Sequence, residues 1–283
     1  MQASINYIRK ELEKLYPPEE IESFIRIIFG HLKQYNLTDL ILKKDEILPI
    51  DEKKEVKRIV TRLANFEPIQ YIVGETEFYG LPFLVSPHVL IPRPETEELV
   101  DWILKSRKTA SPRILDVGTG SGCIPISLKK NWPEANLMGC DISESALKMA
   151  QKNAGLNQTE IAFFHLDILN PVLPTSFPKI DILVSNPPYV TESEKVQMND
   201  NVLKHEPFNA LFVPDDDPLL FYQALATFGK EHLIKGGQLF WEINEAFGKE
   251  CRKLLKENGF SNVQLRKDLN GRNRMIFAES FNQ

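Results

Sequence analysis

The sequence predicts an α/β protein in which helices cover both faces of a mostly parallel sheet, preceded by a small helical bundle. Three observations support this prediction. Apolar residues recur at helical spacing before about residue 75, and from Arg113 onward short apolar runs alternate with helical stretches. Near the carboxyl terminus, two segments with the character of strands flank the polar turn at Asn270-Gly271. Apolar strands separated by helices are typical of a parallel sheet, and the final hairpin adds an antiparallel strand to it.

Composition limits the class of protein. The 283 residues suffice for one large and one small domain, and 42% of them are hydrophobic. No apolar run approaches the roughly 20 residues that cross a bilayer, and the start does not resemble a secretory signal. The 3 cysteines and 5 histidines are scattered, so we expect reduced thiols, a cytoplasmic location and no metal. The net charge of −5 argues against a surface that coats a nucleic-acid backbone.

Residues 1–74 are predicted to form the helical domain. Its apolar positions group into four segments, which start near Ile5, Ile21, Leu40 and Val56. Thr38 and Asp51 are expected to cap the last two segments. The bundle could serve only packing, but we favour a substrate-docking role, because a small domain joined to a catalytic one commonly contributes specificity.

Residues 75–94 are predicted to form a hairpin linker, with strands within 76–86 and a turn at Gly80-Leu81-Pro82. Pro94 is then suited to the first turn of a helix that presents Leu99, Val100, Ile103 and Leu104 on one face. The larger domain is expected to span residues 95–283.

Five strands and two helices are predicted in this domain before the final hairpin. The strands are residues 114–117, 137–140, 161–165, 180–184 and 238–243. The helices are residues 143–153, which Gly155 would end, and residues 218–232. The final hairpin pairs residues 263–266 with residues 274–278.

A glycine-rich loop follows the first of these strands. It contains Gly118, Thr119, Gly120, Ser121 and Gly122 and leads into a helix. Such a loop lets a ligand approach the backbone closely, but nucleotide, flavin and nicotinamide sites share it. Its spacing differs from the dinucleotide fingerprint, and no Gly-Lys-Ser/Thr follows, which disfavours phosphate binding.

Acidic residues at the ends of the next two strands complete a predicted nucleoside pocket. Asp141 could accept hydrogen bonds from both ribose hydroxyls. Asp167 could accept from an adenine amino group, and Ile168 could lie against the ring. Any one of these aspartates could instead cap a helix, especially Asp141 near Ser143. All of these features in order, each after a strand, favour the pocket.

The segment Asn186-Pro187-Pro188-Tyr189 follows the fourth strand and carries the most specific chemical signal. Two prolines fix its backbone, so the Asn186 side-chain carbonyl and the Pro187 backbone carbonyl could accept both hydrogens of one NH₂ group. The Tyr189 ring could give a planar acceptor a flat wall. This geometry suits methylation of the NH₂ group, because paired acceptors favour the pyramidal nitrogen of the transition state over the flat ground state. Catalysis otherwise consists of placing the nitrogen, the methyl group and the sulfur that carries it in line. By itself this loop leaves protein amides and adenine amines open as acceptors.

These motifs together resemble the release-factor glutamine methyltransferases (PrmC/HemK), over nearly the whole chain. Further similarity lies in residues 68–74, residues 77–80, His205-Glu206-Pro207 and residues 267–272. The Pro-Arg-Pro-Glu-Thr-Glu segment at 92–97 discriminates best, since most class I methyltransferases share the glycine loop.

The resemblance implies a class I methyltransferase domain, which is Rossmann-like and seven-stranded, behind a substrate-docking helical domain. It implies S-adenosyl-L-methionine as cofactor and, as substrate, the glutamine of the Gly-Gly-Gln motif in class I peptide-chain release factors, whose N5 would be methylated. Gly118 to Gly122, Asp141 and the region of Asp167 would hold the cofactor. Asn186 would bridge cofactor and glutamine, and Pro187, Pro188 and Tyr189 would complete the glutamine pocket. Thr96 and Glu97 are expected near the cofactor.

The chain departs from the family pattern at three places. Asn244 stands where glycine is frequent, Phe247 stands where glutamine is frequent, and Asp215-Asp216-Asp217-Pro218 replaces a stretch that usually contains glycine. We expect these residues to lie away from the two binding loops and to affect local packing or substrate fit.

The main alternative is an adenine-N6 methyltransferase that acts on DNA or RNA. Such an enzyme flips its base and usually carries an extra basic recognition domain. Fewer than about 100 residues follow Tyr189, and the remaining sheet uses them. A cofactor-binding protein without activity is disfavoured by the intact Asn186 and glycine loop. We therefore expect a partner that is a protein, with no need for nucleic acid or membrane.

Overall fold

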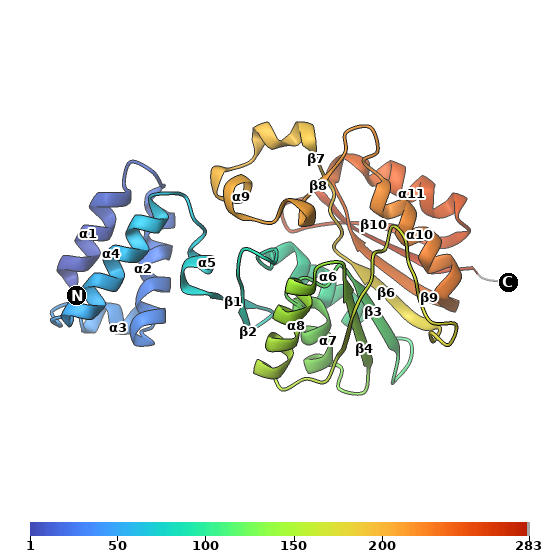
Figure 1. The fold of residues 1–283 in the computed structure, drawn as a ribbon, viewed down its shortest axis with the longest axis horizontal. Helices are drawn as coiled ribbons and strands as arrows, with labels where there is room; N and C mark the ends of the chain where they lie inside the picture. Colours follow the sequence, from blue (N-terminus) through green and yellow to red (C-terminus); the bar gives the residue numbers. More distant parts are fainter. Residues whose placement is uncertain (282–283) are drawn as a thin grey trace. The chain divides into compact units, whose positions relative to one another are not determined.

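The computed structural model describes residues 1–281, except for the side chain of Gln197. The chain separates into two compact units (Figure 1). The first unit comprises Met1–Glu75 and Asn199–His205, and the second comprises Thr76–Met198 and Glu206–Gln283. The first break is close to the expected one, but residues 199–205 belong with the amino-terminal helices.

The first unit is helical, and the amphipathic pattern places its core. Its helices are α1 (Gln2–Leu12), α2 (Pro18–Lys33), α3 (Leu37–Leu42), α4 (Ile50–Leu63), α5 (Ile69–Val73) and α9 (Asp200–His205). Fully buried residues from three helices, such as Ile8, Ile28 and Ile59, form one apolar core. Burial of these side chains removes them from water and stabilises the bundle.

Two expected helix starts in this unit are wrong by two residues each. Asn36, and not Thr38, caps α3, because its side chain accepts from the backbone N of Asp39 at 3.0 Å. The helix α4 begins after Pro49, so Asp51 lies within its first turn. Acidic residues are favourable in a first turn as well as at the cap, so the sequence signal fits both positions.

The segment after α5 is a hairpin, but not a separate linker. It pairs β1 (Glu75–Phe78) with β2 (Leu81–Leu84) around Tyr79-Gly80. Both turn residues have positive φ, 53° and 71°, as a type I′ turn requires, whereas the expected turn at Gly80-Leu81-Pro82 would use residues of β2. Phe78 and Phe83 are buried in the core of the second unit, to which residues 76–94 therefore belong.

The second unit contains the predicted seven-stranded sheet. Its strands are β3 (Arg113–Val117), β4 (Asn136–Asp141), β5 (Ala162–His165), β6 (Ile180–Ser185), β9 (Leu233–Glu242), β10 (Phe260–Lys267) and β11 (Asn273–Ser280). Their order is β10-β11-β9-β6-β3-β4-β5. The strand β11 runs antiparallel to both β9 and β10, and the other pairs are parallel. The terminal hairpin is thus confirmed.

Helices connect the strands. They are α6 (Pro94–Lys105), α7 (Cys123–Asn131), α8 (Glu144–Leu156), α10 (Leu220–His232) and α11 (Gly248–Glu257). Three short 3₁₀ helices and one short strand pair complete the unit. The 3₁₀ helices are η1 (Glu192–Gln197), η2 (Phe208–Ala210) and η3 (Glu245–Phe247), and the strands are β7 (Val190–Thr191) and β8 (Phe212–Val213). Gly155 does not end α8 as predicted, since the helix continues to Leu156. Among residues 1–281, no helix has the length and apolar character needed to cross a membrane.

Successive residues of each strand supply the two faces of the sheet, which helices cover (Figure 1). In β3, Ile114 packs with α6 and α7, while Leu115 packs with α10 and α11. In β9, Phe240 lies on the face of α6, and Trp241 lies on the face of α10. The next residue, Glu242, therefore faces α6, which places a carboxylate beside the first turn of that helix.

Candidate active site

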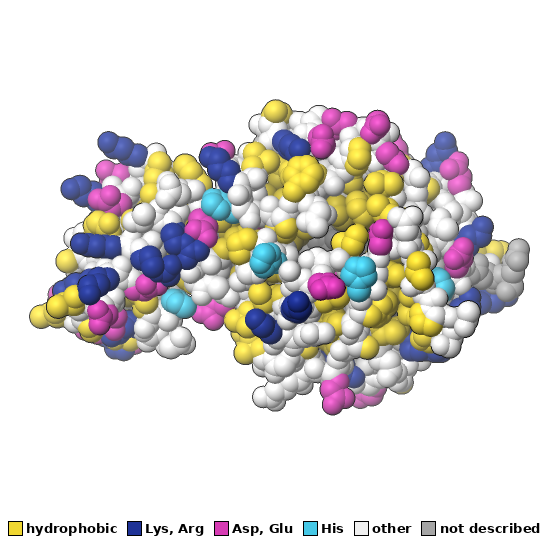
Figure 2. Space-filling model, viewed as in Figure 1, with side chains coloured by type: hydrophobic (Ala, Val, Ile, Leu, Met, Phe, Trp, Pro, Cys, Tyr) yellow, Lys and Arg dark blue, Asp and Glu magenta, His cyan; other side chains and the backbone are white. Residues whose placement is uncertain are grey.

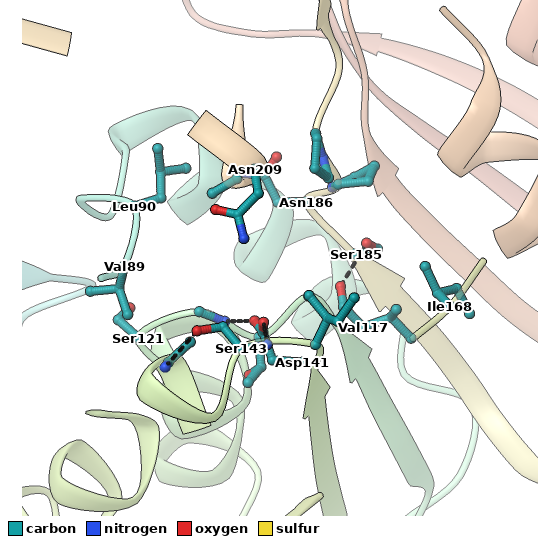
Figure 3. A pocket seen from close by; sticks show the side chains of 18 of the residues that line it. Val89, Leu90, Val117, Ser121, Asp141, Ser143, Ile168, Ser185, Asn186 and Asn209 are labelled. Carbon is teal, nitrogen blue, oxygen red and sulfur yellow. Dashed lines mark hydrogen bonds between the residues drawn. The ribbon is translucent and has the colours of Figure 1, made fainter. Parts of the chain in front are cut away.

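A cavity of about 240 Å³ lies in the second unit, where β3, β4 and β6 end (Figure 3). Ligands of open α/β sheets bind at this edge, because loops leave the sheet here in opposite directions. The lining includes most of the predicted site: Gly118, Thr119, Gly120, Ser121, Asp141, Asp167, Ile168, Asn186, Pro187 and Pro188. Gly122 and Tyr189 are not among the lining residues.

The glycine loop turns sharply between β3 and α7. Gly118 and Gly120 have φ of 72° and 55°, and both line the cavity. Such values favour glycine, and they bring the backbone to the cavity wall. Gly122 has another role, since an added Cβ would lie 3.1 Å from atoms of Ala150 and Ile126. It permits close packing between α7 and α8, so its predicted contact with a cofactor stays a prediction.

Asp141 lies at the end of β4 and faces the cavity beside Ser143 (Figure 3). One carboxylate oxygen accepts from the backbone N of Gly120 at 2.9 Å, and the other accepts from that of Ser143 at 2.9 Å. Ser143 itself caps α8, so Asp141 is not the helix cap. Burial raises the pKa of Asp141, although these backbone hydrogen bonds oppose the rise. The carboxylate is held rigidly, with acceptor capacity left for a ligand.

Asp116 lies in β3, just before the glycine loop, and is fully buried. Neither of its carboxylate oxygens has a hydrogen-bond partner among the described residues, and the same holds for the hydroxyl of Thr119. Burial raises the pKa of Asp116 to about 7; the nearby Thr119 hydroxyl opposes this rise, and Asp141 adds to it. Buried acceptors without a partner are rare in proteins, so their presence beside the glycine loop suggests a missing donor.

Asp167 lies two residues beyond β5 and also lines the cavity. Its carboxylate accepts from the backbone N of Leu169 at 2.9 Å and from Asn170 Nδ2 at 3.1 Å. These bonds fix a local turn that carries Ile168 to the cavity wall (Figure 3). The adenine contacts of Asp167 and Ile168 stay predictions that this geometry allows.

Asn186 lies across the cavity from Asp141, after the end of β6 (Figure 3). Its Nδ2 donates to the hydroxyl of Thr96 at 3.2 Å. This bond leaves the Oδ1 edge of the amide to accept a hydrogen bond from another group. Pro187 and Pro188 line the cavity beside Asn186, as predicted from the rigid segment.

Tyr189 extends away from this cavity toward a buried carboxylate. Its hydroxyl donates to Glu242 Oε1 at 2.9 Å, and burial raises the pKa of Tyr189, so it remains a donor. Thr96 donates to Glu242 Oε2 at 2.6 Å. Glu242 is only 1% exposed, and burial raises its pKa as well. The role of the Tyr189 ring as a flat wall stays a prediction.

Asn244 corrects one expectation. It was expected away from both binding loops, but its Nδ2 donates to the backbone carbonyl of Tyr189 at 3.1 Å. The same nitrogen lies 2.9 Å from Glu194 Oε2. Phe247 and residues 215–218 do not line the cavity, in agreement with the expectation for them. Asn244 thus braces the segment that carries Asn186 and Tyr189.

The structure adds lining residues that the sequence did not single out. They are His88, Val89, Leu90, Leu166, Asn209, Ala210 and Phe221, among others. Thr96, which was expected near the cofactor, also lines the cavity, together with Pro92 and Arg93 of the 92–97 segment. Arg93 Nη2 lies 2.6 Å from Glu206 Oε1, which joins the segment before α6 to the segment before η2. Glu97 is not a lining residue, because its carboxylate accepts from the backbone N of Tyr79 at 2.6 Å. The similarity at 92–97 and 205–207 carried a signal for Arg93 and Glu206, whereas nothing pointed to Asn209.

The fold and the cavity define the class of the protein. Its sheet order, glycine loop and strand-end carboxylate match those of an S-adenosylmethionine-dependent class I methyltransferase. A methyltransferase from Pyrococcus furiosus superposes with a TM-score of 0.55 at 17% identity, covering 80% of this chain and 99% of its own. Human methyltransferase 10 domain containing protein gives 0.51 at 18% identity, covering 72% and 90%. These likenesses support the fold.

Sequence relatives identify the family. Residues 96–207 match the methyltransferase small domain, and residues 4–74 match the PrmC N-terminal domain. The chain is 46% identical to the release factor glutamine methyltransferase of Bacteroides thetaiotaomicron, over 96% of this chain and 97% of that one. It is 46% identical to that of Flavobacterium psychrophilum, over 94% of each, and 37% identical to that of Enterococcus faecalis, over 90% and 91%. The chain belongs to the release factor glutamine methyltransferase family.

Proposed function

We propose that this protein methylates N5 of the glutamine in the Gly-Gly-Gln motif of class I peptide-chain release factors, a protein methylation that acts on translation termination. The observation that carries this proposal is the Asn186 amide, held by Thr96 at 3.2 Å and lining the same cavity as Asp141. The near full-length relatives of the chain are named for this reaction. The acceptor is thus a primary amide, presented by a protein in the cytoplasm.

The residues present fit S-adenosyl-L-methionine. Asp141 offers carboxylate oxygens to the ribose hydroxyls, and Gly118 to Ser121 offer backbone at the cavity wall. Asp167 and Ile168 line the same cavity and would hold the adenine. The buried carboxylate of Asp116, behind the glycine loop, would add negative charge near the positively charged amino group of the methionyl part. When bound, the cofactor supplies a methyl group on a positively charged sulfur.

The protein contributes placement and electrostatics. Asn186 Oδ1 and the Pro187 carbonyl would accept hydrogen bonds from the two N–H groups of the glutamine amide. This pair of hydrogen bonds would turn the nitrogen lone pair toward the methyl group. In the transfer, a new N–C bond would form as the S–C bond of the bound donor broke, and that electron pair would stay on the sulfur. The methylated nitrogen then loses one proton to water, so the product amide is neutral. The side chains need no dedicated base for this sequence, since the proton leaves a positively charged nitrogen.

The same NH₂ geometry would suit adenine, and a specific observation disfavours that acceptor. On the face of the second unit seen in Figure 2, hydrophobic side chains predominate near the centre and Lys and Arg are scattered. Enzymes that flip a base out of a nucleic acid rely on a basic surface to hold the backbone. This face suits a protein partner better than a polyanion.

One reaction tests the proposal. The protein is incubated with labelled S-adenosylmethionine and a class I release factor, beside a copy whose Gly-Gly-Gln glutamine is replaced by alanine. We expect label on the first substrate only, and mass spectrometry should place it on the glutamine side chain. Equal labelling of both substrates would refute the glutamine assignment, as would labelling of an adenine oligonucleotide with neither protein labelled.

A further inference from the structure

A chain of hydrogen bonds connects the buried carboxylate of Glu242 to the Asn186 amide. Thr96 Oγ1 donates to Glu242 Oε2 at 2.6 Å, and Asn186 Nδ2 donates to Thr96 Oγ1 at 3.2 Å. Three elements supply these residues: the end of β9, the first turn of α6 and the loop after β6. None of the motifs considered for cofactor or substrate binding includes Glu242.

With Glu242 ionised and accepting from both Thr96 and Tyr189, proton count sets the direction of this chain. The Thr96 hydroxyl has one hydrogen, which it donates to Glu242, so toward Asn186 it can only accept. Asn186 must therefore turn its NH₂ edge to Thr96 and keep its Oδ1 edge for the substrate. If the hydroxyl donated to Asn186 instead, the amide would present NH₂ to the glutamine and repel its hydrogens.

The other oxygen of the same carboxylate holds the far end of the segment. Glu242 Oε1 accepts from the Tyr189 hydroxyl at 2.9 Å, and Arg274 Nη1 lies 3.5 Å from that hydroxyl. Glu242 is thus linked to both residues that flank the two prolines. It binds Tyr189 directly, and it is connected to Asn186 through Thr96. A buried carboxylate is costly, and an apolar side chain could fill the same space at less expense.

We propose that Glu242 is a positioning residue for methyl transfer, which acts through Thr96 to set the acceptor edge of Asn186 and through Tyr189 to hold the same segment. This inference rests on the proposed function, because it assumes that the Asn186 oxygen accepts a hydrogen bond from an N–H group of the substrate. It predicts that the enzyme distinguishes a glutamine from a glutamate at the Gly-Gly-Gln motif by this orientation.

The test compares Glu242→Met, Thr96→Val, their double variant and Thr96→Ser, with Gln238→Met as control. Gln238 is a buried polar residue of the same strand, whose Nε2 donates to the Ser106 carbonyl at 3.2 Å, away from the cavity. For each protein we would measure kcat and KM for a release factor, cofactor affinity by calorimetry and the thermal midpoint. Affinities for the release factor with glutamine and with glutamate at the motif would be compared as a ratio.

We expect Thr96→Val and Glu242→Met each to lower kcat by about 10- to 100-fold, with cofactor affinity changed less than about twofold. The double variant should be within about threefold of the worse single variant, since both changes interrupt one chain. Thr96→Ser keeps the hydroxyl and should stay within about threefold of the original enzyme, as should Gln238→Met. The preference for glutamine over glutamate should fall in Thr96→Val and not in Thr96→Ser.

Losses that multiply in the double variant would overturn the inference, as would a Thr96→Ser enzyme as slow as Thr96→Val. If Glu242→Met fails to fold, the two Thr96 variants still decide, because they leave the carboxylate in place. The proposed function fails separately, when the original enzyme does not label the release factor. The positioning role fails when that enzyme is active and the variants behave independently.

Discussion

Asn244 donates a hydrogen bond from its side-chain Nδ2 to the backbone carbonyl of Tyr189 at 3.1 Å. The two residues are far apart in sequence, and the bond connects the loop after β9 to the segment that follows Asn186. The Asn244 Oδ1 also accepts from the backbone N of Ala246 at 2.9 Å, which caps η3. A residue that departs from the family pattern is thus part of the support of the site.

Replacement of Asn244 by alanine should weaken both the fold and the reaction. We expect the free energy of unfolding to fall by about 1–2 kcal/mol, because a cap and a buried hydrogen bond are lost together. KM for the release factor should rise as the segment loosens, which initial rates would measure. Asn258→Ala is the control, since Asn258 Nδ2 binds the Leu254 carbonyl at 2.9 Å in α11. Equal effects of both changes on KM would contradict the supporting role.

Asp141→Asn should reduce cofactor affinity and should lower stability modestly, because one oxygen that accepts a backbone N–H is lost. The amide keeps one acceptor oxygen but loses the charge that strengthens hydrogen bonds from ribose hydroxyls. We expect the dissociation constant of S-adenosylmethionine to rise by about 10- to 100-fold, as for one or two charge-assisted bonds. Calorimetric titration measures it, with Asp181→Asn as control, because Asp181 accepts from the Arg113 backbone at 2.8 Å on the same sheet. An unchanged constant would remove Asp141 from the cofactor site.

Asp116 predicts a pH dependence of stability. Its pKa is about 7 in the folded protein and 3.8 as the ordinary value, so between these values the folded state binds more protons than the unfolded state. Its contribution is therefore full below about pH 3.8 and is lost as the pH rises through about 7. An asparagine at this position cannot be charged, so Asp116→Asn should gain stability relative to the original protein from about pH 5 toward about pH 8. Urea unfolding at several pH values tests this, and a constant difference would refute it.

The ion pair between Arg93 and Glu206 should respond asymmetrically to mutation. The Glu206 side chain is 1% exposed, whereas that of Arg93 is 33% exposed. Arg93→Met leaves a carboxylate buried without its partner and should cost about 3–5 kcal/mol. Glu206→Gln should cost less, because the guanidinium can reach water and still donate to the amide. Urea unfolding of both variants at neutral pH gives the comparison, and a larger cost for Glu206→Gln would contradict it.

Much of the sheet was predictable, because its signals are local. Short apolar runs predicted β3, β4, β5, β6 and β9, and an Asn-Gly turn predicted the final hairpin. Helix boundaries were less certain where two nearby residues can both cap the helix, as Asn36 and Thr38 can before α3. The hairpin of residues 75–84 was predicted as a linker because its pattern does not reveal that Phe78 and Phe83 are buried in the core of the second unit.

The sequence by itself determined the chemistry-bearing segments: the glycine loop, Asp141 and Asn186-Pro187-Pro188-Tyr189, each of which follows a strand. Parallel strands bring their carboxyl ends to one edge, so these segments had to meet. Only the tertiary structure decided what supports them. Thr96 and Glu242 are 146 positions apart, and Thr96 and Asn186 are 90 positions apart. Contacts between such distant residues depend on sheet order and strand register, which no local pattern encodes.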